Sequence, residues 1–135
     1  MQDDELDRIK KKQLDELLKN QQEKEIREQL PVMELDSSNF HDAMLQNNLL
    51  LVDFWAEWCG PCKSMHPIFS RMARKYDHVR FARLNVDNSQ DIAKKFGVQS
   101  IPTFIMFKDG KVMQQMVGAV GEPGIHMICK KFLPD

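Results

Sequence analysis

The stretch "LLLVDFWAEWCGPCK", residues 49–63, holds the features that decide the fold. Its first half is apolar at nearly every position, which is typical of a β-strand covered on both faces of a sheet. One acid, Asp53, interrupts this run, although a buried carboxylate without a partner is energetically unfavourable. The second half ends in Cys59 and Cys62. The stretch therefore predicts a buried strand that leads into a helix whose first turn carries two cysteines.

The two cysteines have the spacing of a redox pair. At the start of a helix this spacing puts them within the roughly 4.4–6.8 Å Cα separation that a disulfide tolerates. Unpaired N–H groups and the helix dipole favour a thiolate at Cys59, which we therefore expect to be the nucleophile. Cys62, one turn further in, is expected to stay protonated until a mixed disulfide forms and then to resolve it. Gly60 permits a substrate backbone to approach closely, and Pro61 stiffens the first turn.

The position of Asp53 gives the acid a chemical task. Alternation along the strand places Leu51, Asp53 and Trp55 on one face, and the helix with the cysteines must pack on the sheet. Burial raises the pKa of a carboxyl group, so Asp53 is expected to accept the proton of Cys62 during its attack. The alternative is a satisfied buried acid that only orders the core. Both interpretations require burial.

A metal site is the weaker interpretation of the same cysteines. A structural zinc site uses four ligands, whereas the chain offers one Cys-x-x-Cys pair, His66 at a further Cys-x3-His spacing, and the distant Cys129. We therefore expect no metal. His66 is expected to be a solvated helix residue. Cys129 lies on the apolar stripe of the last predicted helix and is expected to be a core residue rather than a regulatory thiol.

Composition limits the classes of partner. The chain has 135 residues, 42% of them apolar, and a net charge of −1. This is enough for one core, and it gives no general attraction to nucleic acid or to an anionic membrane. No segment has the apolar core of a secretory signal or the roughly 18 apolar residues of a membrane span. We therefore expect a cytoplasmic protein.

The start of the chain differs from the rest and predicts two domains. Up to Pro31 there is no glycine, aromatic residue or proline, but there are 16 charges, of which nine are acidic and seven basic. Acids stand four residues before bases, as in Asp4 and Arg8, which is the favourable order on a helix. No heptad is sustained, so a coiled coil is not expected. We predict a charged helical extension over residues 1–31 and a second domain over residues 32–135.

The second domain alternates between strand and helix signals. Asp109 and Gly110 predict a tight hairpin, so the last two strands are antiparallel. The order predicts a mixed α/β sheet with helices on both faces. The predicted strands are 32–35, 49–56, 79–87, 103–107 and 111–117, and the predicted helices are 36–45, 59–76, 89–97 with Ser89 as N-cap, and 123–132.

The motif "WCGPCK", with "VDFWA" before it and "SIPTFIMFKDGK" after it, resembles the thioredoxin family over about residues 34–133. The resemblance implies a thioredoxin fold with a central five-stranded mixed sheet and four flanking helices. It also implies a protein-disulfide reductase and electron carrier that acts on disulfide-containing client proteins and is recharged by a thioredoxin reductase. The redox-active disulfide of Cys59 and Cys62 then takes the place of a bound cofactor.

The resemblance also implies roles for individual residues. Cys59 is the attacking thiol, Cys62 the resolving thiol, and Asp53 the buried acid. Pro102 corresponds to a cis proline that faces the cysteines, next to a residue whose backbone pairs with an extended substrate strand. The residues implied to form the substrate surface are Trp58, Gly60, Pro61, Ile101, Pro102 and Gly118, with Trp55 packed beneath the site.

Two features depart from the family pattern. Arg83 stands where the family usually has a lysine near the buried acid, and arginine cannot give up its proton, so a titrating lysine is not carried over. The charged extension has no counterpart in the basic family unit. We expect it either to recruit or tether a partner or self-associate, or to be a solvated helix that folds onto its own domain or frays.

Two alternative functions stay open at this point. One is a thiol oxidase or isomerase on the same fold, against which the Gly-Pro between the cysteines argues within the resemblance. The other is a binding module that docks partners through the N-terminal helix.

Overall fold

The computed structural model describes residues 4–133, except for the side chains of 26–29. The chain divides into two compact units, residues 1–31 and residues 32–135. Within the described residues, no helix combines the length and the apolar character that crossing a bilayer requires.

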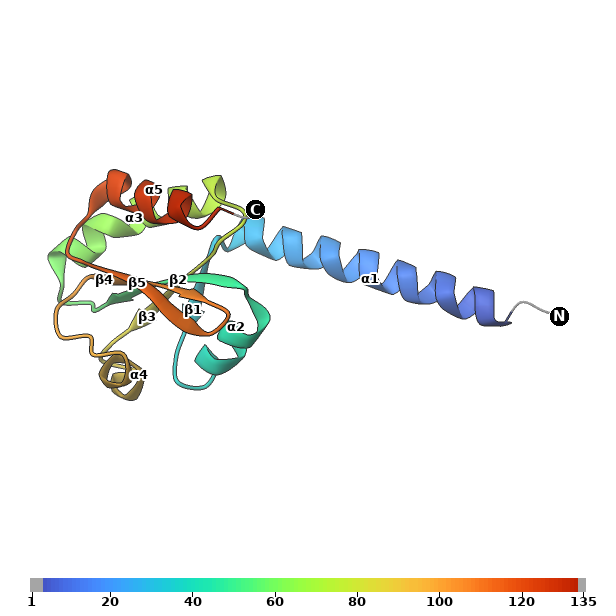
Figure 1. The fold of residues 1–135 in the computed structure, drawn as a ribbon, viewed down its shortest axis with the longest axis horizontal. Helices are drawn as coiled ribbons and strands as arrows, with labels where there is room; N and C mark the ends of the chain where they lie inside the picture. The colour runs from blue at the N-terminus through green and yellow to red at the C-terminus, as the bar shows by residue number, and fades with distance from the viewer. Residues whose placement is uncertain (1–3, 134–135) are drawn as a thin grey trace. The chain divides into compact units, whose positions relative to one another are not determined.

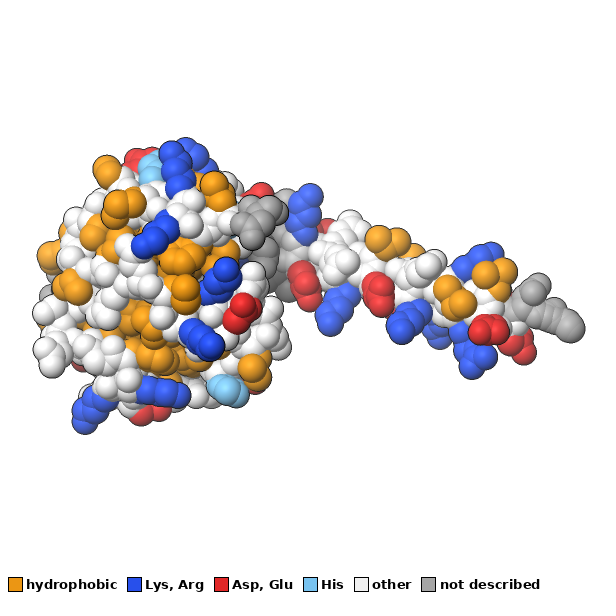
Figure 2. All heavy atoms as spheres, in the orientation of Figure 1, with side chains coloured by type: hydrophobic (Ala, Val, Ile, Leu, Met, Phe, Trp, Pro, Cys, Tyr) orange, Lys and Arg blue, Asp and Glu red, His pale blue; other side chains and the backbone are white. Residues whose placement is uncertain are grey.

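The first unit contains one helix, α1 (Asp4–Gln29). Its first turn holds Asp4, Glu5 and Asp7, which complement the positive end of the helix dipole. Figure 2 shows acidic and basic side chains along this helix, with apolar side chains between them only in small groups. The predicted helix is therefore present, and on the face in view its described apolar side chains do not form a continuous stripe.

The second unit is built on a five-stranded sheet with the order β1-β3-β2-β4-β5. β3 runs parallel to both β1 and β2, whereas β4 runs antiparallel to both β2 and β5. The predicted mixed sheet is confirmed, with β4 as well as β5 in its antiparallel part. The strands are β1 (Val32–Leu35), β2 (Leu49–Trp55), β3 (Arg80–Asn85), β4 (Thr103–Lys108) and β5 (Lys111–Val117).

Helices cover both faces of this sheet, as Figure 1 shows. α3 (Gly60–Lys75) and α5 (Gly121–Lys131) lie on one face, and α2 (Phe40–Gln46) and α4 (Gln90–Lys95) lie on the other. Each face has its own apolar cluster, and β2 contributes to both because its side chains alternate. Every residue of β2 before Trp55 is buried, as the apolar run predicted.

The hairpin between β4 and β5 turns at Asp109 and Gly110, which both have positive φ angles of 52° and 80°. Glycine adopts this backbone region without a steric penalty, and aspartate tolerates it better than most residues. The predicted tight hairpin is therefore confirmed.

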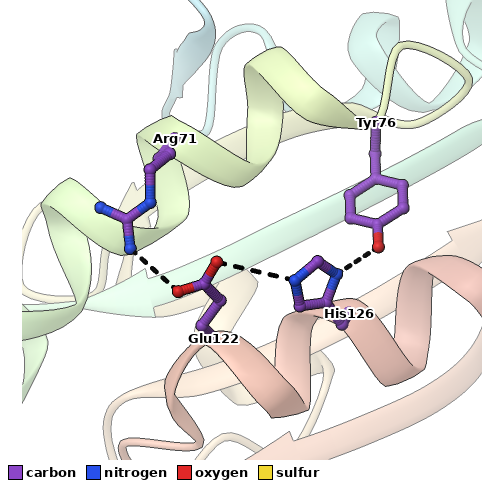
Figure 3. A network of polar contacts seen from close by, with 4 residues as sticks. All are labelled: Arg71, Tyr76, Glu122 and His126. Carbon is purple, nitrogen blue, oxygen red and sulfur yellow. Dashed lines mark hydrogen bonds and ion pairs between the residues drawn. The ribbon is translucent and has the colours of Figure 1, made fainter.

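A polar network joins α3 and the residue that follows it, Tyr76, to α5 (Figure 3). Arg71 of α3 forms an ion pair with Glu122 of α5 at 3.2 Å. Glu122 also lies 3.6 Å from the ring nitrogen Nε2 of His126, whose Nδ1 is hydrogen-bonded to the hydroxyl of Tyr76. These contacts connect the helix that carries the cysteines to the C-terminal helix.

Candidate active site

Cys59 and Cys62 are joined by a disulfide at the N-terminus of α3, with their Cα atoms 5.3 Å apart. Cys59 is the N-cap residue and Cys62 lies in the first turn. Pro61 occupies the first turn, where a helix needs no backbone donor. The redox pair predicted from the spacing is therefore present, and its helix begins where the sequence placed it.

The two sulfur atoms have different surroundings. Cys59 keeps 5% of its surface exposed and Cys62 none. The backbone N–H of Cys62 donates a hydrogen bond to the Cys59 sulfur at 3.3 Å. In the reduced protein, an N–H aimed at this sulfur and the positive end of the helix dipole both favour the thiolate. This geometry suits a nucleophile at Cys59 and a protected second thiol at Cys62.

The loop that leads into β4 lies against the Cys59 sulfur. The carbonyl oxygen of Ile101 is 3.8 Å from this sulfur, and the Ile101–Pro102 peptide bond is cis. The N–H of Gly118 donates a hydrogen bond to the carbonyl oxygen of Pro102 at 2.8 Å. Gly118 has a φ of 99°, which favours glycine. The structure therefore brings these three residues together with the cysteines.

Trp58 and Gly60 form the exposed rim of the site. The Trp58 side chain is 70% exposed, and its indole N–H donates a hydrogen bond to the Asp87 carboxylate at 2.9 Å. A Cβ atom placed on Gly60 would meet nothing within 4 Å, so the space above this turn is open. Sequence reasoning missed Asp87, which carries no motif and follows β3 in a turn.

Asp53 is fully buried on β2, and neither of its carboxyl oxygens has a hydrogen-bond partner among the described residues. Burial raises the pKa of Asp53 to about 7. The positive charge of Arg83 opposes this rise in the pKa, and the negative charge of Glu34 adds to it. A carboxyl group with a pKa near neutrality can both take up and release a proton under physiological conditions.

His66 corrects one sequence prediction. It was expected to be a solvated helix residue, but its ring packs edge-on against Trp55 with the ring centroids 4.7 Å apart. Within the described residues, His66 Nε2 and Trp55 Nε1 are both buried and have no hydrogen-bond partner. Burial, assisted by the charge of Arg83, lowers the pKa of His66. His66 is therefore part of the layer between α3 and β2.

Arg83 lies beside this layer and is held by two contacts. Its Nε–H donates a hydrogen bond to the Glu34 carboxylate at 2.6 Å. Its guanidinium carbon lies 5.9 Å from the centroid of the Trp55 ring, within cation–π range. Sequence reasoning missed Glu34, because the contact depends on which strand pairs with β1.

Cys129 stands apart from the redox pair as a free, buried thiol. Burial raises the pKa of Cys129 to about 12, so the thiol stays protonated and unreactive at neutral pH. The prediction of a core residue is confirmed. Among the residues that the structure describes, no group of three or more His, Cys, Asp or Glu side chains is arranged to hold a metal ion.

Comparison with known proteins gives consistent matches over the second unit. The family model described as Thioredoxin matches residues 31–131. A thioredoxin from Alicyclobacillus acidocaldarius is 44% identical over 87 residues, which are 64% of this chain and 83% of that protein.

Solved structures agree with this match. The structure of Plasmodium falciparum thioredoxin aligns with a TM-score of 0.72 and 30% identity, covering 76% of this chain and all of that one. A chain from a structure on thiol resolution in yeast mitochondrial 1-Cys peroxiredoxin by the glutathione and thioredoxin systems aligns with a TM-score of 0.69 and 35% identity. That alignment covers 75% of this chain and 95% of the other.

Proposed function

This chain belongs to the thioredoxin family, and on that premise we propose that it reduces disulfide bonds in client proteins through Cys59 and Cys62. Family membership and the cysteine pair make it a thiol-disulfide oxidoreductase. The observation that carries the proposal is the disulfide at the N-terminus of α3, in which Cys59 keeps 5% of its surface exposed and Cys62 none. This difference in exposure supports Cys59 as the thiol that attacks the client first and Cys62 as the thiol that attacks second.

In the first step, the Cys59 thiolate attacks one sulfur of the client disulfide. A bond forms between Cys59 and that sulfur, the client disulfide bond breaks, and the other client sulfur leaves as a thiolate that takes a proton from water. The proposed role of Cys59 is supported by the N–H of Cys62, which points at its sulfur. The hydrogen bond lowers the free energy of the thiolate relative to the thiol.

In the second step, Cys62 gives its proton to the Asp53 carboxylate and attacks the Cys59 sulfur. The bond between Cys59 and the client breaks, and the second client sulfur leaves as a thiolate. Two electrons have then passed to the client, and the chain holds the Cys59–Cys62 disulfide. The proposed role of Asp53 is supported by its burial on the sheet face that α3 covers and by its pKa of about 7.

We propose that an extended client segment binds across the rim of the site. The open space above Gly60 and the exposed ring of Trp58 support one side of this surface. The other side is proposed from Ile101, Pro102 and Gly118, because an extended strand can pair with an exposed backbone edge. Pro61 lies between the cysteines and is proposed to contact the client directly.

The partners follow from the same proposal. The oxidised chain needs two electrons to act again, and we assign their supply to a thioredoxin reductase. Clients are proteins with accessible disulfides, and a peroxiredoxin is a reasonable client to test, because one structural neighbour comes from work on such a system. We also propose that the protein works as an electron carrier in a reducing compartment, because dithiols persist under reducing conditions. The compartment that we propose is the cytoplasm.

This function is tested by measuring the reduction potential of the Cys59–Cys62 pair. The protein is equilibrated in graded dithiol buffers, and its free thiols are counted by mass spectrometry. A potential near −270 mV, a value known for thioredoxin itself and not predicted from this structure, supports a reductase. A potential near −180 mV or higher would instead indicate an oxidase or isomerase. If Cys59 and Cys62 did not form a disulfide in these buffers, the function as a binding module would be favoured instead.

A further inference from the structure

Three charged residues form a row across three neighbouring strands. The register pairs Glu34 of β1 with Arg83 of β3, and Arg83 with Asp53 of β2. Paired residues on adjacent strands project to the same face of a sheet, so all three side chains lie on the face covered by α3. The side-chain exposure falls along the row from 64% at Glu34 to 24% at Arg83, and Asp53 is fully buried. The row therefore leads from solvent to the buried acid.

Arg83 stands between two carboxyl groups but bonds to only one of them. Its Nε–H donates to Glu34, whereas the Asp53 oxygens have no partner among the described residues. The aromatic face of Trp55 adds a second contact to the same guanidinium. The bond to Glu34 draws the guanidinium toward β1, and the Trp55 contact engages it on β2 without a hydrogen bond to the Asp53 carboxyl.

This choice of partner matters for the reaction. A guanidinium that formed a direct ion pair with Asp53 would favour its carboxylate, and such a pair typically lowers a carboxyl pKa by about 1–3 units. Asp53 would then be ionised and too weakly basic to take a proton from a thiol near neutral pH. With Arg83 held by Glu34, the buried carboxyl keeps the high pKa that burial gives it.

We propose that Glu34 is a positioning residue that holds the Arg83 guanidinium away from Asp53, so that Asp53 can exchange a proton with Cys62 near neutral pH. The proposal rests on the proposed function of Asp53. Glu34 acts through Arg83, and it touches neither the sulfur atoms nor the client.

Other groups lie on the elements packed against the strand of Asp53. From α3 these are Cys62, which is in the disulfide here, and His66, whose pKa burial lowers so that its ring is neutral near pH 7. From β4 the residue paired with Asp53 is Phe104, which carries no charge. In the oxidised protein, Glu34 and Arg83 are therefore the charges that act on the Asp53 carboxyl.

The test follows the titration of the Asp53 carboxyl carbon by carbon-13 NMR in the full-length oxidised protein, where the two active-site thiols do not titrate. The Asp53→Asn variant assigns the signal. We expect Glu34→Gln to lower the Asp53 midpoint by about one pH unit, because the freed guanidinium can approach the carboxylate. The control is Glu122→Gln, which removes a similar ion pair between Glu122 of α5 and Arg71 of α3 and is expected to leave the midpoint unchanged.

A double-mutant cycle separates positioning from the direct effect of the Glu34 charge. In the Arg83→Gln background, Glu34→Gln removes the same charge but has no guanidinium to release, so its effect is expected to be much smaller. An unchanged or higher midpoint in Glu34→Gln overturns the proposal, and so does an equal shift in both backgrounds. Failure of the proposed function of Asp53 can be told apart from failure of the Glu34 proposal. It would appear as an unchanged rate of client release in Asp53→Ala, whatever the Asp53 titration midpoints of the Glu34 variants are.

Discussion

The backbone N–H of Cys62 donates a hydrogen bond to the Cys59 sulfur across the first turn of α3. One cysteine thus supplies both the resolving thiol and a donor that stabilises the attacking one. Since this donor belongs to the backbone, it survives substitution of the Cys62 side chain.

Substitution of each cysteine should therefore block a different step of the reaction. We expect Cys59→Ser to abolish reduction of a protein disulfide, because no thiolate remains at the position of the attacking sulfur. Cys62→Ser should still attack and then accumulate a mixed disulfide with the client, since no thiol is left to resolve it. Non-reducing mass spectrometry of each variant with an oxidised client measures the adduct. Equal adduct from both variants would contradict the assigned roles.

Removal of the buried carboxyl should slow the second half of the reaction. We expect Asp53→Ala to lower the rate of client release by about 10- to 100-fold near pH 7, because Cys62 loses its proton acceptor. The defect should shrink above pH 9, where thiols ionise without a base. Stopped-flow measurement of release across pH checks this. The same rate as wild type at every pH would leave Asp53 with a structural role.

The same carboxyl should make stability depend on pH. Asp53 holds its proton to about pH 7 when folded but loses it near pH 3.8 when unfolded. Between these two pH values the folded state binds more protons than the unfolded state. The free energy of unfolding therefore falls as pH rises, by about 4 kcal/mol in total. We expect Asp53→Asn to be more stable than wild type at pH 8, by up to this amount, with the difference shrinking toward pH 4. Urea unfolding at both pH values measures it, with the exposed Asp42→Asn as control.

Cys129 should not react with thiol reagents in the folded protein. In the folded, oxidised protein we expect no alkylation of Cys129 by iodoacetamide at pH 8, because the thiol is buried and its pKa is about 12. One alkylated site should appear after denaturation without reductant. Rapid labelling of the native protein would show that α5 opens far more readily than its packing indicates.

The charged extension should be dispensable for the chemistry. The redox site is built from residues of the second unit, so removal of residues 1–30 should change activity on a small-molecule disulfide by less than about twofold. Sedimentation of both forms tests self-association through α1, which stays a prediction. A large loss of activity in the shortened chain would mean that the extension shapes the site.

Local patterns were sufficient for most of the fold. The apolar run of β2, the hairpin at Asp109 and Gly110, and the helix that begins after Cys59 each follow from a short stretch with a distinct period or turn signal. The thioredoxin resemblance added the five-stranded sheet and the cis bond before Pro102, which periodicity alone does not reveal.

Side-chain partners could not be predicted in the same way. Periodicity identifies the face of a strand or helix but not the residue opposite it, so the pairing of Glu34 with Arg83 required the strand order. His66 was misassigned because its packing depends on the ring of Trp55, which is eleven positions earlier in the chain. Ser89 was predicted as an N-cap and occupies that position, but its hydroxyl makes no capping bond.

The row of Glu34, Arg83 and Asp53 limits how this half of the sheet can evolve. Side chains alternate along a strand, so one extra residue between Arg80 and Arg83 would turn the guanidinium to the opposite face, among the apolar side chains around Leu84. A charge buried there without a partner would be strongly destabilising. Descendants of this sequence that keep the row must therefore preserve Glu34 and Arg83 themselves and the number of β3 residues before Arg83.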